Sequence, residues 1–382
     1  MLSKVLSSRY AECPPLNTTR ERSIAMKRRL STTLFLIAGM SLTVQAQVPN
    51  DEERKEGFVP LFYGTDFSGW QFGGGYDLPE KQPANWKVEE GIIKLSGGGG
   101  PHLGTQWDYD DFDMRFQWRA MREKYNSGFF IRSARKVRPN QINLAKGAEG
   151  RFFGGKMKGG KAVPELQNPP FEWNEWRVRI VGDTVTFWCN GKLAWEGTEF
   201  QSKRGHIGLQ AEGAPLEIRN LRIKEIGWQY LGNPDMWPDA EKAAGLKLSD
   251  YVLRLEWKAD KPTMAEINLR GAGFKKASVR LGDLENGSGG IVGFAAEPAK
   301  NTDNPAGRWN YTEVRVADGK ATIWQNGVDV VKDIDLKSDA NFPKTGGLTF
   351  AFKKTEFQFR NVRVKPLRKS TPTTNSSGDR GE

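Results

Sequence analysis

The sequence predicts an all-β protein built from two tandem β-sandwich domains. Short runs of β-branched and aromatic residues are separated by turn formers, and the 382 residues include 43 glycines. Several of these runs alternate apolar and polar side chains, as strands with one face on a core do. The C-terminal third of the chain also repeats the middle of the chain, block by block.

Four sequence blocks recur in the same order at offsets of 136 to 141 residues. The matched pairs are residues 111–118 with 250–257, 173–174 with 309–310, 185–191 with 321–327, and 217–224 with 358–365. Because four ordered blocks share nearly one offset, they indicate a duplicated fold.

Each block has the pattern of a strand or a hairpin. Residues 176–180 and 217–223 alternate apolar with polar side chains. The pairs at residues 190–191 and 326–327 are Asn-Gly, which readily takes the positive φ angles of a tight hairpin turn. Each half is therefore a succession of antiparallel strands, and a sandwich or jelly roll follows.

The repeat sets the expected domain limits. The first domain should span residues 57–226, and the second should span residues 227–367. The second is a shorter, degenerate copy that lacks the N-terminal strands of the first. Residues 368–382 carry no apolar side chain to bury, so we expect a disordered tail.

Residues 1–46 are predicted to be an upstream extension followed by an export signal. A basic stretch at residues 27–29 precedes an apolar core at residues 34–38, and a small-residue cleavage pattern ends at Ala46. Met26 is therefore the expected start, with cleavage after Ala46 and a periplasmic or secreted product. No stretch approaches the roughly 20 apolar residues of a membrane span, so no transmembrane segment is predicted.

The composition also bears on partners and cofactors. The formal net charge is +11, but no basic helix or RNA-binding aromatic motif accompanies it, so we predict no nucleic-acid partner. The two histidines, His102 and His206, lack the spacing of a zinc site. The aspartates within residues 108–113 have oxygens of the kind that bind calcium, but strand alternation sends them to different faces. We therefore predict no cofactor. The sequence carries no signal for an oligomeric state.

A set of ordered motifs spans nearly all of the first domain. The motifs are residues 57–64, 69–70, 86–93, 111–115, 126–132, 173–174, 188–191, 208–210 and 219–222. As a set they resemble the bacterial 3-keto-disaccharide hydrolase domain family, which is related in fold to concanavalin A-like lectins and glucanases. The resemblance implies two concanavalin A-like jelly-roll sandwiches. It also implies an exported hydrolase that acts on glycosides, possibly 3-keto-disaccharides in the first domain. Two positions depart from the family: no acidic residue precedes Gln141, and Glu212 stands where a His is common.

The repeat serves as an internal control for site residues, because a residue kept in both halves is expected to serve the shared scaffold. Polar residues at 126–127, 210 and 212 of the first half face Met, Ala, Ala and Lys in the second half. The candidate substrate-binding residues are Asn126, Ser127, Arg132, Gln141, Gln210, Trp107 and Trp195. Arg132 has a counterpart in Arg270, so a structural ion pair remains an alternative to sugar binding. The two tryptophans have no counterpart, which favours sugar stacking, with surface packing as the alternative.

Glu212 and Glu149 are the candidate catalytic carboxylates near this face. Cleavage of a 3-keto glycoside needs a base that takes the proton next to the ketone, and a partly buried carboxylate suits that step. For Glu149 the alternative is a solvated loop acid. We favour a glycoside-acting hydrolase because the first half keeps polar residues that a scaffold does not need. The alternative function is a non-catalytic, lectin-like carbohydrate-binding module.

Overall fold

The computed structural model describes residues 49–74, 82–233, 236–271, 277–283 and 285–367. The predicted export signal and the predicted tail lie outside the described residues. Every strand below belongs to one compact unit. In the part of the chain that the structure describes, no helix is long and apolar enough to cross a membrane.

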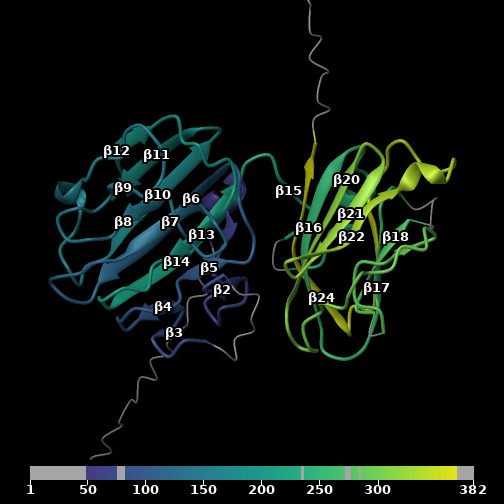
Figure 1. The fold of residues 1–382 in the computed structure, drawn as a ribbon, viewed down its shortest axis with the longest axis horizontal. Helices are drawn as coiled ribbons and strands as arrows, with labels where there is room; N and C mark the ends of the chain where they lie inside the picture. Colours follow the sequence, from purple (N-terminus) through teal and green to yellow (C-terminus); the bar gives the residue numbers. More distant parts are fainter. Residues whose placement is uncertain (1–48, 75–81, 234–235, 272–276, 284, 368–382) are drawn as a thin grey trace, which may run out of the picture. The chain divides into compact units, whose positions relative to one another are not determined.

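The first sandwich consists of two antiparallel sheets, which we name sheet A and sheet B (Figure 1). In order across sheet A lie β12 (Lys192–Gly197), β11 (Thr184–Cys189), β10 (Asn174–Val181), β6 (Phe112–Ala120), β14 (Leu216–Glu225), β4 (Ile92–Leu95) and β3 (Trp86–Glu89), with β1 (Val59–Pro60) paired to β14. In order across sheet B lie β2 (Trp70–Phe72), β5 (Leu103–Thr105), β13 (His206–Leu209), β7 (Gly128–Ser133), β8 (Gln141–Asn143) and β9 (Phe152–Phe153).

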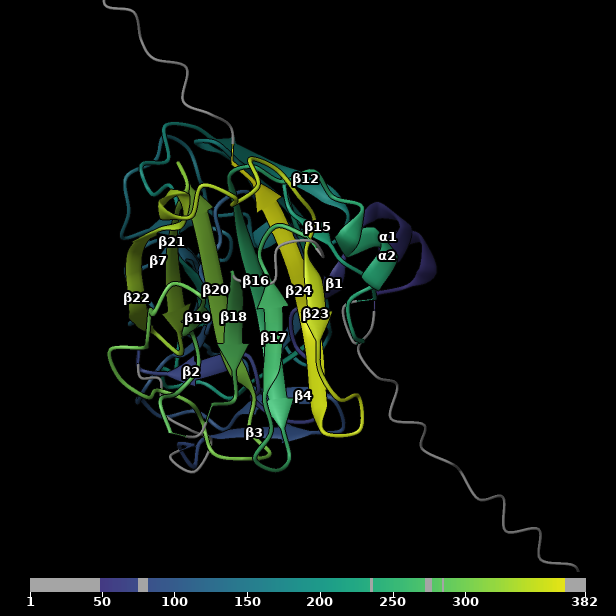
Figure 2. The ribbon, with the colours of Figure 1, turned by 90° about the vertical axis from the view of Figure 1, so that its right-hand side faces the viewer.

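The second sandwich repeats this plan with sheets C and D, which Figure 2 shows as two layers. In order across sheet C lie β15 (Gln229–Tyr230), β24 (Phe357–Pro366), β16 (Tyr251–Ala259), β20 (Asn310–Ala317), β21 (Lys320–Gln325) and β22 (Val328–Asp335). In order across sheet D lie β19 (Ile291–Val292), β18 (Ser278–Leu281), β17 (Ala265–Asn268) and β23 (Thr349–Ala351). The described helical segments are α1 (Asp51–Glu56), α2 (Ala240–Ala244), η2 (Pro164–Leu166) and η3 (Leu336–Ser338). The prediction of an all-β chain with two sandwiches is confirmed.

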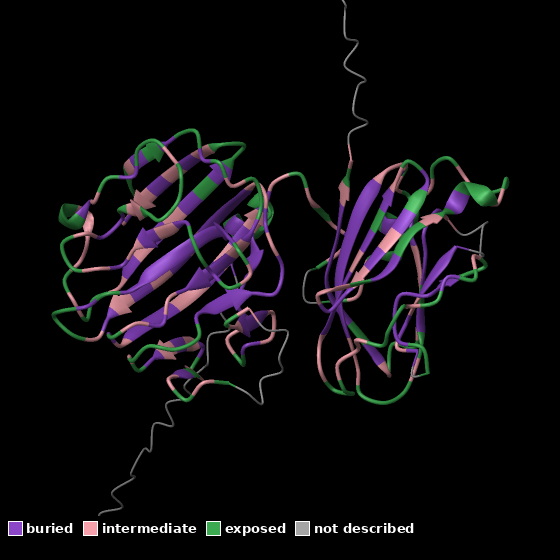
Figure 3. Ribbon diagram, viewed as in Figure 1, coloured by how far each residue is buried: buried purple, intermediate pink, exposed green. Residues whose placement is uncertain are grey.

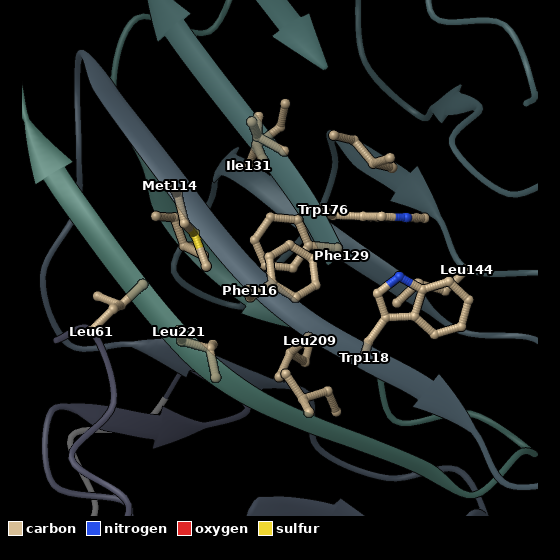
Figure 4. Close-up of a cluster of buried hydrophobic side chains, with 14 of the residues drawn as sticks. Leu61, Met114, Phe116, Trp118, Phe129, Ile131, Leu144, Trp176, Leu209 and Leu221 are labelled. Carbon is tan, nitrogen blue, oxygen red and sulfur yellow. The ribbon is translucent and has the colours of Figure 1, made fainter. Parts of the chain in front are cut away.

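The core of the first sandwich lies between sheets A and B. Along β6 the buried and half-buried residues alternate from Met114 to Ala120, which explains the alternating sequence (Figure 3). Phe116 of β6 and Phe129 of β7 stack with ring centroids 4.4 Å apart, and Trp118 lies beside them in the same layer (Figure 4). Ring packing of this kind buries large apolar areas, so the aromatic positions of the repeated blocks hold the two sheets together.

The two Asn-Gly turns have the predicted geometry. Asn190 and Gly191 have φ angles of 49° and 77°, and Asn326 and Gly327 have φ angles of 45° and 93°. Two consecutive positive φ angles are typical of the tight turn that joins antiparallel strands. The turns connect β11 to β12 and β21 to β22, as the repeat predicts.

Each turn asparagine also explains a second repeated motif. The Asn190 amide donates a hydrogen bond to Asn174 Oδ1 at 3.0 Å, and the Asn326 amide donates one to Asn310 Oδ1 at 2.7 Å. Asn174 and Asn310 are the asparagines of the two matched Trp-Asn pairs. A buried amide needs such a partner. The Asn–Asn hydrogen bond therefore gives the Trp-Asn motif and the Asn-Gly motif a structural role in both halves.

Buried ion pairs join residues of the first sandwich to residues of sheet C. Arg363 on β24 lies 2.5 Å from Glu225 on β14, and each of these side chains is 2% exposed. Arg254 on β16 lies 2.7 Å from Asp108. Burial raises the pKa of Glu225, and Arg363 opposes that shift. A carboxylate this deeply buried depends on its cationic partner.

We therefore expect Arg363→Leu to lower the free energy of unfolding by about 3–5 kcal/mol, because it leaves the Glu225 carboxylate buried without its partner. Urea unfolding monitored by tryptophan fluorescence measures the change. The control is Lys158→Met, which breaks an exposed pair with Glu199 and should cost less than about 1 kcal/mol. Equal losses for the two variants would contradict this explanation.

Candidate functional site

Side chains of β7 and β8 form a row on the outer face of sheet B. Phe129 and Ile131 belong to the core cluster, so their neighbours Gly128 and Phe130 face away from the core. Gln141 of β8 pairs with Phe130 across the strands. Cross-strand partners share a face, so the Gln141 side chain also lies on the outer face.

Gln141, Ser127 and Gln210 come together on this face. The Gln141 amide nitrogen donates to Gln210 Oε1 at 2.9 Å and to the Ser127 carbonyl at 3.2 Å. The Ser127 hydroxyl donates to the Gln210 carbonyl at 2.8 Å. Ser127 is almost fully buried, so it fixes the backbone, whereas both glutamines are half-buried. The structure thus brings together three residues that are far apart in the sequence.

Asn126 and Glu212 extend this polar cluster at the ends of the same strands. The Asn126 amide donates to Glu212 Oε1 at 2.7 Å. Asn126 is exposed and Glu212 is half-buried. The hydrogen bond orients the carboxylate and leaves its second oxygen, Oε2, for another partner. We name Asn126, Ser127, Gln141, Gln210 and Glu212 the polar cluster.

A glycine makes room for the polar cluster. A Cβ atom placed on Gly128 would lie 1.9 Å from the Gln141 amide nitrogen and 2.5 Å from Gln141 Cγ. No side chain fits at such distances, so the Gln141 side chain lies directly over the Gly128 backbone. The Gly of the Asn-Ser-Gly motif is therefore required by the site and not by a turn.

The second sandwich lacks this arrangement. Its counterpart of β7 is β17, where Met264 and Glu266 replace Asn126 and Gly128. Glu266 pairs with Ala351 of β23, and all three of these side chains are exposed. With no glycine and no amide at these positions, the polar cluster belongs to the first sandwich alone.

Glu149 does not join the polar cluster. Its side chain is 1% exposed and accepts a hydrogen bond from the Tyr125 hydroxyl. Burial and this hydrogen bond raise the pKa of Tyr125, so the phenol keeps its proton. Tyr125 belongs to the core cluster, whereas its neighbour Asn126 is exposed and contacts Glu212. The two carboxylates thus contact residues that lie on opposite sides of this segment, and the expected position of Glu149 near the outer face is corrected.

Arg132 has the environment of a structural residue. It is 1% exposed, its Nη2 atom lies 2.7 Å from Asp111, and its Nη1 atom donates to the Gly182 carbonyl at 2.7 Å. The counterpart Arg270 likewise lies beside Asp250, the counterpart of Asp111. Because both halves contain the same pair, it belongs to the scaffold.

Trp107 and Trp195 offer no open ring face to a sugar. Trp107 is 4% exposed and donates to Glu256 Oε1 at 3.0 Å. Trp195 is 8% exposed and donates to the Gly150 carbonyl at 2.9 Å. Both indoles are buried with satisfied N–H groups, which is the packing role of this side chain.

Two residues beside the polar cluster were not predicted as site residues from the sequence. Phe153 pairs with Gln141 across β9 and β8, and its ring is 62% exposed. His102 stacks on Phe130, with ring centroids 5.5 Å apart. Each lies in a glycine-rich stretch without strand periodicity, so no sequence pattern pointed to His102. For Phe153, the only available signal was an aromatic residue within such a stretch.

Among the described residues, no group of three His, Cys, Asp or Glu side chains lies close enough together to hold a metal ion. The polar cluster itself contains one carboxylate, three amides and one hydroxyl group.

Comparison with known proteins identifies relatives of both sandwiches. The family model described as "3-keto-alpha-glucoside-1,2-lyase-like domain" matches residues 57–224 and 243–365. A protein of Bacteroides thetaiotaomicron named 3-keto-disaccharide hydrolase is 32% identical over 244 residues, which cover 47% of this chain and 81% of the relative. The resemblance drawn from the sequence motifs is confirmed. The double match, with the four sheets, confirms two tandem concanavalin A-like jelly-roll sandwiches.

Solved structures with similar folds are more distant. A Parabacteroides distasonis protein provisionally named a glycosyl hydrolase is 22% identical with a TM-score of 0.38, covering 47% of this chain and 99% of that chain. A carbohydrate-binding module from Bacillus subtilis is 10% identical with a TM-score of 0.33, covering 41% and 96%. The β-glucanase of Bacillus licheniformis is 13% identical with a TM-score of 0.32, covering 41% and 92%.

The contact between Gly128 and Gln141 is testable by mutation. Gly128→Ala should lower the free energy of unfolding by about 1–3 kcal/mol, because the added methyl group overlaps the Gln141 side chain. The double variant Gly128→Ala/Gln141→Ala removes the overlapping atoms and should regain part of that loss. Urea unfolding of the two variants makes the comparison, and a double variant no more stable than the single one would refute the contact.

Proposed function

The chain belongs to the family of 3-keto-alpha-glucoside-1,2-lyase-like domains, and from this membership and the polar cluster we propose that the first sandwich cleaves glycosides oxidised at C3. The observation that carries the proposal is the Glu212 carboxylate, which is half-buried and oriented by Asn126 on the outer face of sheet B. We also propose that the protein is exported, with cleavage after Ala46.

Glu212 is the proposed general base. A ketone at C3 acidifies the proton on C2, and Glu212 takes that proton through Oε2 while Asn126 holds Oε1. The electrons of the C2–H bond form an enolate, which then expels the glycosidic oxygen from C1. The leaving oxygen receives the proton that Glu212 took. Water adds to the resulting C1–C2 double bond, so the overall reaction is hydrolysis.

The two glutamines are the proposed sugar-binding residues. Because the Gln141 amide nitrogen donates to Gln210 Oε1, the Gln141 oxygen and the Gln210 nitrogen are available to sugar hydroxyl groups. One accepts and the other donates, which matches the two hydrogen-bonding roles of a hydroxyl group. Arg132, Ser127, Trp107, Trp195 and Glu149 support the fold around the site in this proposal.

Phe153 is the proposed stacking platform. Its exposed ring lies on the same face as Gln141, its cross-strand partner. The aliphatic face of a sugar ring packs on an aromatic ring while its hydroxyl groups bind the amides beside it. Phe153 takes the role that the sequence suggested for the two buried tryptophans.

A second candidate function is carbohydrate binding without catalysis. The observation in its favour is that the polar cluster contains one carboxylate, whereas a glycosidase of the two-acid type needs a pair. Elimination from a 3-keto sugar needs one base, which is why we favour the enzyme. Incubation with oxidised and unoxidised disaccharides, followed by mass spectrometry of the products, separates the two functions.

We expect Glu212→Gln to reduce kcat on a 3-keto-disaccharide by about 10²- to 10⁴-fold, which is the usual contribution of a general base. The free energy of unfolding should change by less than about 0.5 kcal/mol, because the side chain is half-exposed. Glu172→Gln, at an exposed loop carboxylate, is the control and should leave kcat unchanged. Full activity of the Glu212 variant would rule out this base, and binding without products from the wild type would select the binding module.

Phe153→Ala should weaken binding of the same sugar by about tenfold, because it removes the stacking surface and leaves the amides in place. Isothermal titration measures the dissociation constant in the Glu212→Gln background, where the sugar persists. The matched control is Leu193→Ala, which removes another exposed apolar side chain from β12 of sheet A. Unchanged affinity of the Phe153 variant would place the sugar elsewhere.

A further inference from the structure

Two hydrogen-bond donors face each other beside the polar cluster. The backbone N–H of Ala211 donates to His102 Nδ1 at 3.2 Å, so Nδ1 is an acceptor and the neutral ring carries its proton on Nε2. His102 Nε2 lies 3.4 Å from Arg138 Nη2, and a guanidinium nitrogen only donates. The Nε2–H group and the guanidinium therefore converge as two donors, and none of the described residues supplies an acceptor to both.

The state of the imidazole follows from its surroundings. His102 is 7% exposed and lies on the ring of Phe130. Burial, with a smaller contribution from Arg138, lowers the pKa of His102. The ring is accordingly neutral near pH 7, and its single N–H points at Arg138. Arg138 itself is exposed, so its guanidinium lies where the buried imidazole borders solvent.

These donors lie on the same face as the polar cluster. Phe130, which supports His102, is the cross-strand partner of Gln141. The N–H that fixes the His102 tautomer belongs to Ala211, between Gln210 and Glu212 in the chain. Arg138 comes from the loop that joins β7 to β8. One sheet face therefore presents a base and, next to it, two converging donors.

We propose that His102 and Arg138 bind the ketone oxygen of the substrate and stabilise it as the enolate forms. This inference rests on the proposed function and specifies its substrate as a sugar that carries a carbonyl group. When Glu212 takes the C2 proton, the electron pair of the C2–H bond forms the C2–C3 double bond, and negative charge develops on O3. The Nε2–H group and the guanidinium donate to O3, and this stabilisation ends when the C1–O bond breaks and the carbonyl returns.

Donors that are in place before the reaction stabilise developing charge without reorganisation, which explains why an exposed arginine lies against a buried imidazole here. An unoxidised sugar presents a hydroxyl group at C3, whose own O–H needs an acceptor that the two donors do not supply, and it develops no enolate charge. The pair should thus select for the oxidised sugar as well as accelerate its cleavage.

The test uses variants that remove the donors singly. His102→Asn keeps an acceptor near Nδ1 for the Ala211 N–H and has no donor at the position of Nε2, whereas His102→Gln can still place an amide N–H there. Arg138→Met removes the guanidinium, and Lys136→Met, at an exposed cation of the same loop, is its control. Binding of a 3-keto-disaccharide and of its unoxidised parent is measured by isothermal titration with the Glu212→Gln change present, and turnover is measured without that change.

We expect His102→Asn and Arg138→Met to abolish the preference for the keto sugar while binding of the parent stays within about twofold. In the otherwise wild-type protein, kcat should fall by about 10²- to 10³-fold for His102→Asn, the usual effect of losing one such donor. His102→Gln should retain more activity than His102→Asn, and Lys136→Met should match the wild type.

An unchanged keto preference in both donor variants would overturn the inference. If the preference depends on His102 and Arg138 but the wild type forms no product, the donor site stands and the proposed reaction fails. Titration with inorganic phosphate tests whether the two donors bind any anion. If Arg138→Met abolishes phosphate binding but leaves the keto preference intact, the donors form a general anion site and the proposal is wrong.

Discussion

The close contact between the Gln141 side chain and the Gly128 backbone is the constraint on which the outer face of sheet B depends. Because Gly128 has no side chain, Gln141 crosses over β7 and reaches Gln210, which directly follows the neighbouring strand β13. The strands β8, β7 and β13 thereby contribute to one hydrogen-bonded surface instead of three separate rows. In the second sandwich Glu266 occupies the position of this glycine, and the described residues form no such surface there.

In the two copies of the fold, matched arginines pair with carboxylates from different parts of the chain. Arg222 of the first half and Arg363 of the second half are matched positions on the last long strand of each sandwich. Arg222 pairs with Glu53 of α1 at 2.8 Å, whereas Arg363 pairs with Glu225 of the first sandwich at 2.5 Å. A buried arginine needs a carboxylate, and each copy obtains it from a different part of the chain. Through Arg363, the second sandwich thus supplies the cationic partner of a buried carboxylate in the first sandwich.

Much of the fold was predictable from the sequence because it is encoded by local rules. Alternation along β10 and β14 marked strands with one buried face, and the Asn-Gly pairs marked the tight turns. For Arg132, the counterpart Arg270 indicated the structural alternative to sugar binding, and both arginines lie beside an aspartate. These features depend on neighbours in the sequence or on a counterpart in the repeat.

The rest depends on packing between distant segments, which no local pattern reports. Trp107 lacks a counterpart because it contacts Glu256 of the second sandwich, so its uniqueness reflected an interdomain contact and not a sugar platform. Glu149 lies in a glycine-rich segment typical of loops, yet the fold buries its carboxylate against Tyr125. The tautomer and the surroundings of His102 are set by Ala211 and Arg138, which are far from it along the chain. By contrast, Gln141 and Gln210, which the sequence placed at one candidate site, form a hydrogen bond because β8 and β13 are both neighbours of β7.

The proposed function requires that the outer face of sheet B in the first sandwich holds a carbohydrate. The most direct measurement is a crystal structure of the Glu212→Gln protein soaked with a 3-keto-disaccharide. We expect a sugar ring over Phe153, with hydroxyl groups at Gln141 and Gln210 and its C2 carbon beside residue 212. Electron density for the sugar on any other surface, with this face empty, would show that sheet B does not bind the substrate.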